Sequence, residues 1–298
     1  MASSRFTLQW KIGRTDSGKM VREFLKEKEI SSASLTDIKF KGGNIRVNDC
    51  DVTVRHTLAE EDLLEVFFPL EEPSSGVRGE DFHLDIVYED DYLLVINKPA
   101  GMNTIPSREH PTGSFANGLI GYYEKIGLQA TSHIVTRLDR DTSGLVLVAK
   151  HRHIHHLLSK QQKAGSVKRE YEAFAEGELS SLAGTIKEPI GRKSDSIIER
   201  EVRADGQYAC THFAVAGRYE QFTHVRLRLE TGRTHQIRVH MAFIGHPLLG
   251  DDLYGGDTAL IGRQALHCMK ISFEHPYLGR TLSFEAQLPE DMAALLKK

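Results

Sequence analysis

Charged residues of both signs come directly before an apolar run in the stretch HIVTRLDRDTSGLVLVAK, residues 133–150. Asp139 lies between Leu138 and Arg140, and a Ser-Gly pair then leads into the apolar run. A carboxylate held rigidly in front of a buried strand can act as a nucleophile or as a base. An aspartate in a turn also has a purely local role, because its side chain bonds to the neighbouring backbone. The spacing alone leaves both interpretations open.

A second basic stretch, ETGRTHQIRVH, covers residues 230–240. It reads as a glycine turn leading into a helix, with Thr234 as the expected N-cap and Gly245 at the expected C-terminal stop. Arg233 and Arg238 are suited to binding phosphate or to neutralising a carboxylate. The alternative is an ordinary solvated helix face.

An aromatic residue lies among basic residues in VKREYEAFAEG, residues 167–177. Tyr171 follows Lys168 and Arg169 in a predicted strand. A tyrosine in such a setting can stack on a nucleic-acid base. Tyrosine in a strand also packs against its neighbours without any functional role.

The histidines of HRHIHH raise the possibility of a metal site. His151 and His155 share one face of the predicted helix, as zinc-ligand pairs do, but the H-E-x-x-H pattern is absent. A metal-dependent phosphoesterase built on His151, His153 and His155 therefore stays only as an alternative. The cysteines are widely spaced and form no C-x-x-C pair, so neither a disulfide framework nor a zinc knuckle is expected; they are Cys50, Cys210 and Cys268.

Several other classes of enzyme lose support. The glycine-rich stretches match no phosphate-loop or dinucleotide-binding pattern, and no G-x-S-x-G sequence occurs. We therefore expect no metal or organic cofactor. The 298 residues, 40% of them hydrophobic and 27% charged, are of ordinary globular composition. Apolar runs are far too short for a membrane span, and the N-terminal residues lack the apolar core of a secretory signal. We expect a cytoplasmic protein without a membrane partner, and a monomer.

Charge is distributed unevenly along the chain. Residues 1–48 carry ten Lys/Arg and five Asp/Glu, whereas residues 49–72 carry one Arg and eight acids. A second basic block covers residues 131–171, with eight Lys/Arg and three acids. Local patches of this kind are compatible with nucleic-acid binding, although solvated faces look the same in a sequence.

Hydrophobic periodicity and turn residues suggest two parts. Residues 19–48 read as two short amphipathic helices followed by a strand, and residues 69–81 are rich in Pro, Gly, Ser and charge. Beyond them, strands alternate irregularly with helices, including a helix at 151–164 and a strand pair within 208–232. We assign residues 1–72 to a small α/β module, 73–81 to a linker and 82–298 to a larger α+β domain.

Five stretches together match a known family. They are VYEDDYLLVINKPAGM, TRLDRDTSGLVLVAK, KREYEAFAEG, TGRTHQIRVHMAFIGHPLLGDDLYG and ALHCMKISFEHP. Over residues 80–298 the chain resembles the RluA-type pseudouridine synthases. The resemblance implies a pseudouridine synthase fold around a largely antiparallel mixed sheet. It also implies isomerisation of uridine in structured RNA without a cofactor. Residues 19–48 resemble a degenerate form of the small RNA-binding module that often precedes this domain.

The resemblance gives individual residues expected roles. Asp139 matches the essential catalytic aspartate, Tyr171 the active-site tyrosine, and Arg238 the arginine that pairs with the aspartate. Arg137 matches the arginine that fills the space of the flipped-out nucleotide. The residues expected to contact RNA are Arg137, Arg140, Lys168, Arg169, Arg233 and His235. Lys98 is a weaker candidate, for RNA contact or loop support.

Some alternatives stay open at this stage. Asp139 could attack C1′ of the ribose, add to C6 of uracil or remove a proton from C2′, and the sequence does not choose among them. The partner is expected to be large-subunit rRNA, or else tRNA, with ribosomal precursor particles as a further candidate. Thr136 stands where the family usually has His, which is expected to change the fit to RNA. An RNA-binding or ribosome-assembly protein without activity is the rival of a different class.

Overall fold

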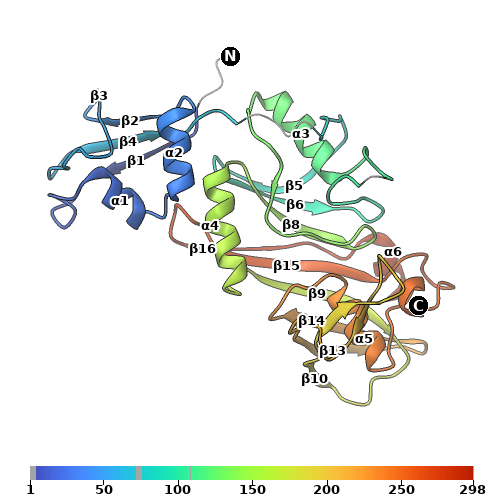
Figure 1. Ribbon diagram of the computed structural model, residues 1–298. Helices are drawn as coiled ribbons and strands as arrows, with labels where there is room; N and C mark the ends of the chain where they lie inside the picture. The colour runs from blue at the N-terminus through green and yellow to red at the C-terminus, as the bar shows by residue number, and fades with distance from the viewer. Residues whose placement is uncertain (1–4, 72–75, 108, 298) are drawn as a thin grey trace.

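The computed structural model describes residues 5–71, 76–107 and 109–297. Residues 73–75 of the predicted linker lie outside the described residues. The molecule is elongated, with a small module at one end and a larger domain that extends away from it (Figure 1). None of the helices in the described segments has the length and apolar character needed to cross a membrane.

The small module is built on an antiparallel four-stranded sheet in the order β1-β4-β2-β3. Its elements are β1 Thr7–Lys11, α1 Val21–Glu27, α2 Ser32–Phe40, β2 Asn44–Val47, β3 Cys50–Asp51 and β4 Leu63–Phe67. The predicted pair of helices followed by a strand is present, and the Ser31 hydroxyl accepts a bond of 3.1 Å from the backbone N–H of Ser34, as a capping residue does. Phe24, Leu25 and Leu64 lie in a core that belongs to this module.

A ten-stranded sheet forms the larger domain (Figure 1). Its main path runs β10-β13-β14-β9-β15-β8-β6-β5, with β16 on β15 and β7 on β8. The strands are β5 Asp85–Glu89, β6 Leu93–Lys98, β7 His133–Ile134, β8 Ser143–Ala149, β9 Lys168–Glu176, β10 Ala183–Ile186, β13 Thr211–Arg218, β14 Phe222–Leu229, β15 Leu266–Glu274 and β16 Thr281–Glu285. Among the described strands, β8 and β15 are the one parallel pair. The predicted α+β class with a largely antiparallel mixed sheet is confirmed.

Short helices and one separate strand pair complete the domain. They are α3 Phe115–Ile126, α4 Arg152–Lys163, α5 Gln236–Phe243, the 3₁₀ turn η1 Asp252–Tyr254, α6 Glu290–Leu295, and the paired strands β11 Ile190–Arg192 and β12 Arg200–Val202. Helix α4 packs on β7 and β8 and lies between the small module and the body of the sheet (Figure 1). Helix α5 packs against β12 and β13.

Strand β8 is the anchor of the functional region. All seven of its residues are buried, as the apolar run in the sequence predicts. Gly144 has a φ of +116°, and a Cβ atom at this position would collide with the backbone of Cys268 in the parallel strand β15. Only glycine therefore allows the two strands to approach here, immediately after the turn that carries Asp139.

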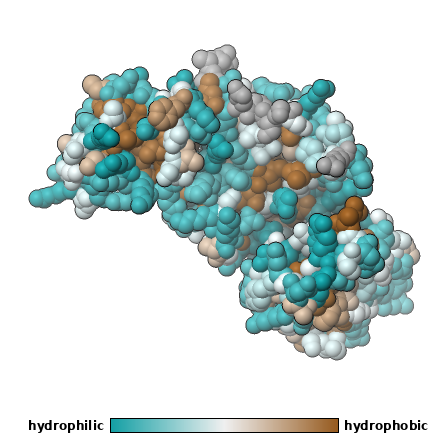
Figure 2. Space-filling view, viewed as in Figure 1, coloured by the Kyte–Doolittle hydropathy of each residue, from teal (hydrophilic) through white to brown (hydrophobic). Residues whose placement is uncertain are grey.

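In the space-filling view the molecule has separate lobes (Figure 2). The surface is hollowed between the part that contains α3, β5 and β6 and the part that contains β10, β13, β14 and α5, and hydrophobic residues gather around this hollow. The two halves of the sheet thus present surfaces toward each other, and β15, β8 and β9 connect them.

Candidate active site

A cleft of about 500 Å³ collects most of the predicted site residues. Its walls come from the loop after β6, the segment before β8, the start of β9 and the segment between β14 and α5. The predicted residues that line it are Arg137, Asp139, Arg140, Arg169, Tyr171, Arg233, His235 and Arg238. Lys168 does not line this cleft; its side chain is exposed on β9.

Asp139 is held by its own turn and by the loop that follows β6. The backbone carbonyl of Asp139 accepts a bond of 3.2 Å from the N–H of Thr142. The buried Thr104 hydroxyl donates to the carbonyl of Leu138 at 2.6 Å, which fixes the residue just before Asp139. The carboxylate itself is 27% exposed, so it faces the cleft rather than the core. A ligand in the cleft can reach it.

Lys98, at the end of β6, contacts the Asp139 turn from its buried side. Its fully buried ammonium group donates to three carbonyl oxygens, those of Pro99 at 2.8 Å, Met102 at 2.9 Å and Arg140 at 3.1 Å. Burial lowers the pKa of Lys98 to about 8, although the negative charge of Asp139 acts in the opposite direction. Lys98 therefore connects the loop after β6 to the Asp139 turn and places a positive charge on the buried side of that turn.

Arg238 bridges two carboxylates. Its Nη1 lies 3.4 Å from Asp139 Oδ2, which is the predicted ion pair. Its Nε and Nη2 donate to the two oxygens of Asp251 at 2.7 Å each. Burial disfavours the charged guanidinium, but the bonds to Asp251 outweigh this and the pKa of Arg238 is raised. The chief partner of Arg238 is thus Asp251, a residue for which no role was expected from the sequence.

Asp251 and Asp252 are adjacent in GHPLLGDDLYG, and nothing in the linear sequence distinguishes them. Only the fold does, because Asp251 is fully buried whereas Asp252 is exposed. With two of its donors fixed by Asp251, Arg238 presents its remaining terminal nitrogen to Asp139 in one orientation. Asp251 is therefore a positioning residue for the pair of Arg238 and Asp139.

The start of α5 differs from the prediction that Thr234 caps it. The N-cap is His235, in a left-handed conformation with φ 57°, and no side chain caps it in the usual way. The Gln236 side chain instead accepts from the backbone N–H of Arg233 at 3.0 Å and from the hydroxyl of Thr231 at 2.8 Å. The start of α5 is thus stabilised by Gln236, its own first residue. The His235 side chain does not cap the helix and faces the cleft instead.

The His235 ring lies between Tyr254 and Asp139. Its Nδ1 is 2.8 Å from the Tyr254 hydroxyl, and its Nε2 is 3.9 Å from Asp139 Oδ1. Burial lowers the pKa of His235, with Asp139 acting in the opposite direction. The imidazole is therefore mainly neutral at neutral pH, and Arg238 supplies the permanent positive charge beside the aspartate.

Tyr171 forms a wall of the cleft. It lies on β9 opposite Cys268 of β15, and its side chain is buried, with only 4% of the residue exposed. Burial raises the pKa of the Tyr171 phenol well above its usual value, so the hydroxyl keeps its proton. The guanidinium of Arg169 lies 6.0 Å from the ring centroid. An aromatic face next to a carboxylate is suited to holding a flat, uncharged base.

The rim of the cleft is basic. Arg140 lies 3.9 Å from Asp141, and Arg233 donates to the carbonyl of Tyr208 at 3.0 Å. Arg137 is exposed and has no hydrogen-bond or ion-pair partner among residues 5–71, 76–107 and 109–297. Its neighbour Thr136 is buried, and the Thr136 hydroxyl accepts from the N–H of Leu147 at 2.9 Å. Thr136, at the position where a His was expected from the resemblance, is thus a small side chain that is bonded to β8.

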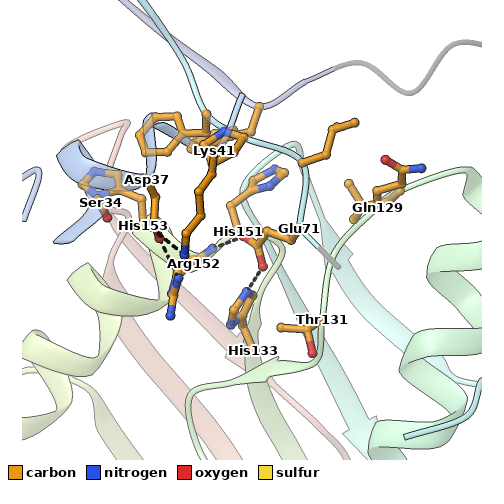
Figure 3. A pocket seen from close by; sticks show the side chains of 15 residues that line it. Ser34, Asp37, Lys41, Glu71, Gln129, Thr131, His133, His151, Arg152 and His153 are labelled. Atoms are coloured by element: carbon orange, nitrogen blue, oxygen red, sulfur yellow. Dashed lines mark hydrogen bonds and ion pairs between the residues drawn. The ribbon is translucent and has the colours of Figure 1, made fainter. Parts of the chain in front are cut away.

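A second pocket, of about 590 Å³, lies between the small module and the larger domain (Figure 3). The His151 ring stacks on Phe6 with 3.9 Å between centroids, and the His153 ring on Phe68 with 5.5 Å. His155 instead stacks on His133. His151, His153 and His155, the residues of the alternative metal site, therefore each pack on a different ring.

The charged residues of this second pocket pair with one another (Figure 3). Glu71 contacts His133 at 2.5 Å and accepts from the backbone N–H of Arg152 at 2.8 Å. Asp37 pairs with both Arg152 and Lys41, each at 3.0 Å. The contacts of Glu71 with His133 and Arg152, and of Asp37 with Arg152, connect the module to the domain, whereas Lys41 and Asp37 belong to the same helix end.

Comparison with known proteins identifies the family of this chain. Residues 92–243 match the family model described as RNA pseudouridylate synthase. Over 277 residues the chain is 54% identical to the uncharacterized RNA pseudouridine synthase YjbO of Bacillus subtilis (strain 168), covering 93% of this chain and 98% of the relative. It is 42% identical over 232 residues to the ribosomal large subunit pseudouridine synthase D of Vibrio parahaemolyticus, covering 73% and 71%.

A solved structure supports the fold. The human RNA pseudouridylate synthase domain containing 4 superposes with a TM-score of 0.59 at 22% identity, over 71% of this chain and 91% of that chain. The sequence comparisons thus confirm the expected family, and the solved structure confirms the expected fold. The chain belongs to the RNA pseudouridylate synthase family, in its RluA-type branch, and is an RNA pseudouridine synthase.

Proposed function

We propose that this enzyme isomerises uridine in large-subunit ribosomal RNA and that Asp139 is its catalytic carboxylate. The observation that carries the proposal is the position of Asp139, which is partly exposed in the cleft and lies 3.4 Å from a buried arginine. A carboxylate that a ligand can reach and that a fixed guanidinium orients is placed for nucleophilic attack or for proton removal.

The cleft suggests a role for each neighbouring group. Tyr171 offers a mostly buried ring on which uracil can stack, and its protonated hydroxyl is a candidate proton donor. Arg238 orients the aspartate at 3.4 Å, and the His235 ring lies on its other side at 3.9 Å. Arg137, exposed and without a partner in the described segments, is suited to fill the space that a flipped nucleotide leaves and to contact nearby phosphates. The isomerisation needs a cleft that excludes water, because water that attacked C1′ of the ribose would hydrolyse the nucleotide and release the uracil.

The preference for large-subunit rRNA rests on the relatives. The Vibrio parahaemolyticus protein that is 42% identical over 73% of this chain is named for the large ribosomal subunit. Arg140, Arg169 and Arg233 at the rim can contact the phosphates of a folded RNA around the flipped nucleotide. tRNA is the competing substrate, and the experiment below includes it.

The small module is proposed to add RNA contacts. Residues 1–48 carry ten Lys/Arg against five Asp/Glu, and Arg14, Arg22 and Lys26 are exposed. Replacing these three residues by Gln is expected to weaken RNA affinity and flatten its salt dependence while turnover at saturating RNA stays within about twofold. An unchanged salt slope would exclude the role.

The activity and its substrate are tested together by release of tritium from RNA labelled at C5 of uridine, since C5 exchanges its hydrogen for the bond to C1′. Purified enzyme is given unmodified large-subunit rRNA and tRNA in separate reactions, next to the Asp139→Asn variant. The wild type is expected to release tritium from rRNA, and the variant to release none while binding RNA within a few-fold of wild type. Release by the variant would remove Asp139 from the mechanism.

The other outcomes are equally decisive. Release of tritium from tRNA alone would identify tRNA, in place of rRNA, as the substrate. The proposed role of Asp139 would still hold. Release from neither naked RNA, followed by release from precursor particles of the large subunit, would place the reaction during ribosome assembly. Binding without release from any of the three would favour the rival function of an inactive RNA-binding protein.

A further inference from the structure

A cysteine, a histidine and a glutamate gather on the sheet beside the segment that leads into α5. Cys210 directly precedes β13 and Glu230 directly follows β14, and the N–H of Glu230 donates to the carbonyl of Cys210 at 3.1 Å. Side chains two residues apart in a strand point to the same face, so His212 lies on the face that Cys210 occupies. Register therefore brings three metal-binding side chains together without any close sequence motif.

The three side chains are within reach of one ion. Cys210 Sγ lies 3.8 Å from His212 Nε2, and His212 Nε2 lies 2.7 Å from Glu230 Oε1. All three ligand atoms are within 4.8 Å of one another. Ligand atoms around a tetrahedral zinc ion are roughly 3.3–3.6 Å apart, given the usual bond lengths. Small rotations of exposed side chains, which open the bond between His212 and Glu230, are enough to reach that geometry.

The surrounding residues orient the cluster as they do in metal sites. Thr185, opposite His212 on β10, bonds through its hydroxyl to His212 Nδ1 at 2.9 Å. This contact directs Nε2 toward the cysteine and glutamate, as the outer partners of metal-bound histidines do. The Tyr208 hydroxyl donates to the second oxygen of Glu230 at 3.3 Å.

Access differs within the cluster. Cys210 is buried, whereas the side chains of His212 and Glu230 are 34% and 49% exposed. An ion can thus reach His212 and Glu230 from solvent and then bind the buried sulfur of Cys210. The set combines thiolate, imidazole and carboxylate, which suits zinc better than magnesium or calcium.

We propose that Cys210, His212 and Glu230 form a binding site for a zinc ion, with water as the fourth ligand. Binding replaces the thiol proton of Cys210, which leaves to solvent, with a bond between sulfur and zinc; no electron is transferred. Because zinc binds the thiolate and the proton must leave, affinity is expected to increase as pH rises.

The site is connected to the cleft through the backbone. Arg233 Nε donates to the carbonyl of Tyr208 at 3.0 Å, and Gln236 Nε2 donates to the carbonyl of Cys210 at 3.0 Å. An ion bound to Cys210 and Glu230 would therefore restrain the segment that carries Arg233 and His235. The role is structural, since the ligands do not line the cleft.

The test is titration of the reduced, tag-free, full-length protein with Co²⁺, which reports a bond to thiolate by a charge-transfer band in the near ultraviolet. We expect one equivalent to produce the band, and Zn²⁺ to remove it by competition. Cys210→Ser should abolish the band, and His212→Gln or Glu230→Gln should weaken binding at least about tenfold. Cys50→Ser is the matched control, because Cys50 is an exposed free thiol outside the cluster.

A second measurement guards against misfolded variants. Zinc in hundredfold excess over its Kd should raise the Tm of the wild type and of Cys50→Ser by a few degrees, and leave that of folded Cys210→Ser unchanged. Thr185→Val keeps all three ligands and should weaken Co²⁺ binding roughly tenfold. A wild type without the band, or a band that survives Cys210→Ser, overturns the proposal. Neither result bears on tritium release, so the proposed function is tested separately.

Discussion

The two pockets of this enzyme are similar in size and opposite in character. The pocket between module and domain encloses about 590 Å³ and the cleft around Asp139 about 500 Å³. In the first, Glu71 is paired with His133, and Asp37 with Arg152 and Lys41 (Figure 3). In the second, Asp139 is only partly neutralised by its neighbours and is open to the cleft.

The difference shows that volume does not identify a functional site. Charges that satisfy one another hold two parts of a protein together and leave little for a ligand. Charges held in place by other residues, as Asp251 holds Arg238, retain the capacity to act on something that binds. The following predictions test this contrast, in order of decreasing effect.

The largest effect is expected from Asp251→Asn. The change removes the charge that pairs most closely with the buried Arg238 and leaves Asp139 at 3.4 Å, so the free energy of unfolding should fall by about 3–5 kcal/mol. Turnover should fall at least about 10²-fold, because Arg238 no longer has one fixed orientation. Denaturant titration and tritium release measure the two losses.

The control for that variant is Asp37→Asn in the other pocket. Its partner Arg152 has a side chain that is 69% exposed, so the loss should stay below about 1 kcal/mol and turnover should not change. Equal losses in the two variants would contradict the contrast between the pockets.

Tyr171→Phe should separate the ring of Tyr171 from its hydroxyl. If the hydroxyl transfers a proton, turnover falls about 10²-fold or more while RNA affinity stays within a few-fold, because the stacking surface remains. Tyr123→Phe is the comparison, since Tyr123 is also buried but lies outside the cleft. A turnover loss no larger for Tyr171→Phe than for Tyr123→Phe would show that the Tyr171 hydroxyl transfers no proton and would leave only the ring with a role.

Acid should weaken the boundary between module and domain. Burial lowers the pKa of His153 to about 4, whereas the unfolded chain takes up this proton near pH 6.5. The free energy of unfolding is therefore undiminished above pH 6.5, where His153 is neutral in both the folded and the unfolded chain. It falls by roughly 3 kcal/mol at most as pH decreases toward 4, because the unfolded chain binds the proton first. His153→Leu should flatten the fall in unfolding free energy over this range, and an unaltered pH profile would show that His153 is not responsible.

The smallest effect concerns single charges at the RNA surface. Arg137→Gln should make the slope of log affinity against log salt less steep by roughly 0.7–0.9, the contribution of about one phosphate contact. Lys168→Gln should change the slope less, because Lys168 lies outside the cleft lining. Filter binding at several salt concentrations measures both slopes, and a larger change for Lys168 would shift the RNA path away from the cleft.

Local patterns in the sequence were sufficient for much of the fold. The buried run of β8, the helices α1, α2 and α4, and the β13–β14 pair all follow from periodicity and turn residues. Helix α3 was not predicted, and its two internal glycines explain why, since glycine disfavours helix. A Cβ at Gly118 would collide with the Phe82 ring and one at Gly121 with the backbone of Glu80. These glycines serve a tertiary contact that local propensity does not encode.

The sequence by itself determined the family, the long strands and the helices α4 and α5 beyond residue 80, and most of the residues that converge on the cleft, because these depend on local patterns and on motifs within single stretches. Only the tertiary structure decided that Asp251 is the chief partner of Arg238, that His235 turns toward Asp139, and that Cys210 meets Glu230. Such pairings depend on strand register and burial, which join residues far apart in the chain and leave no periodic trace in it.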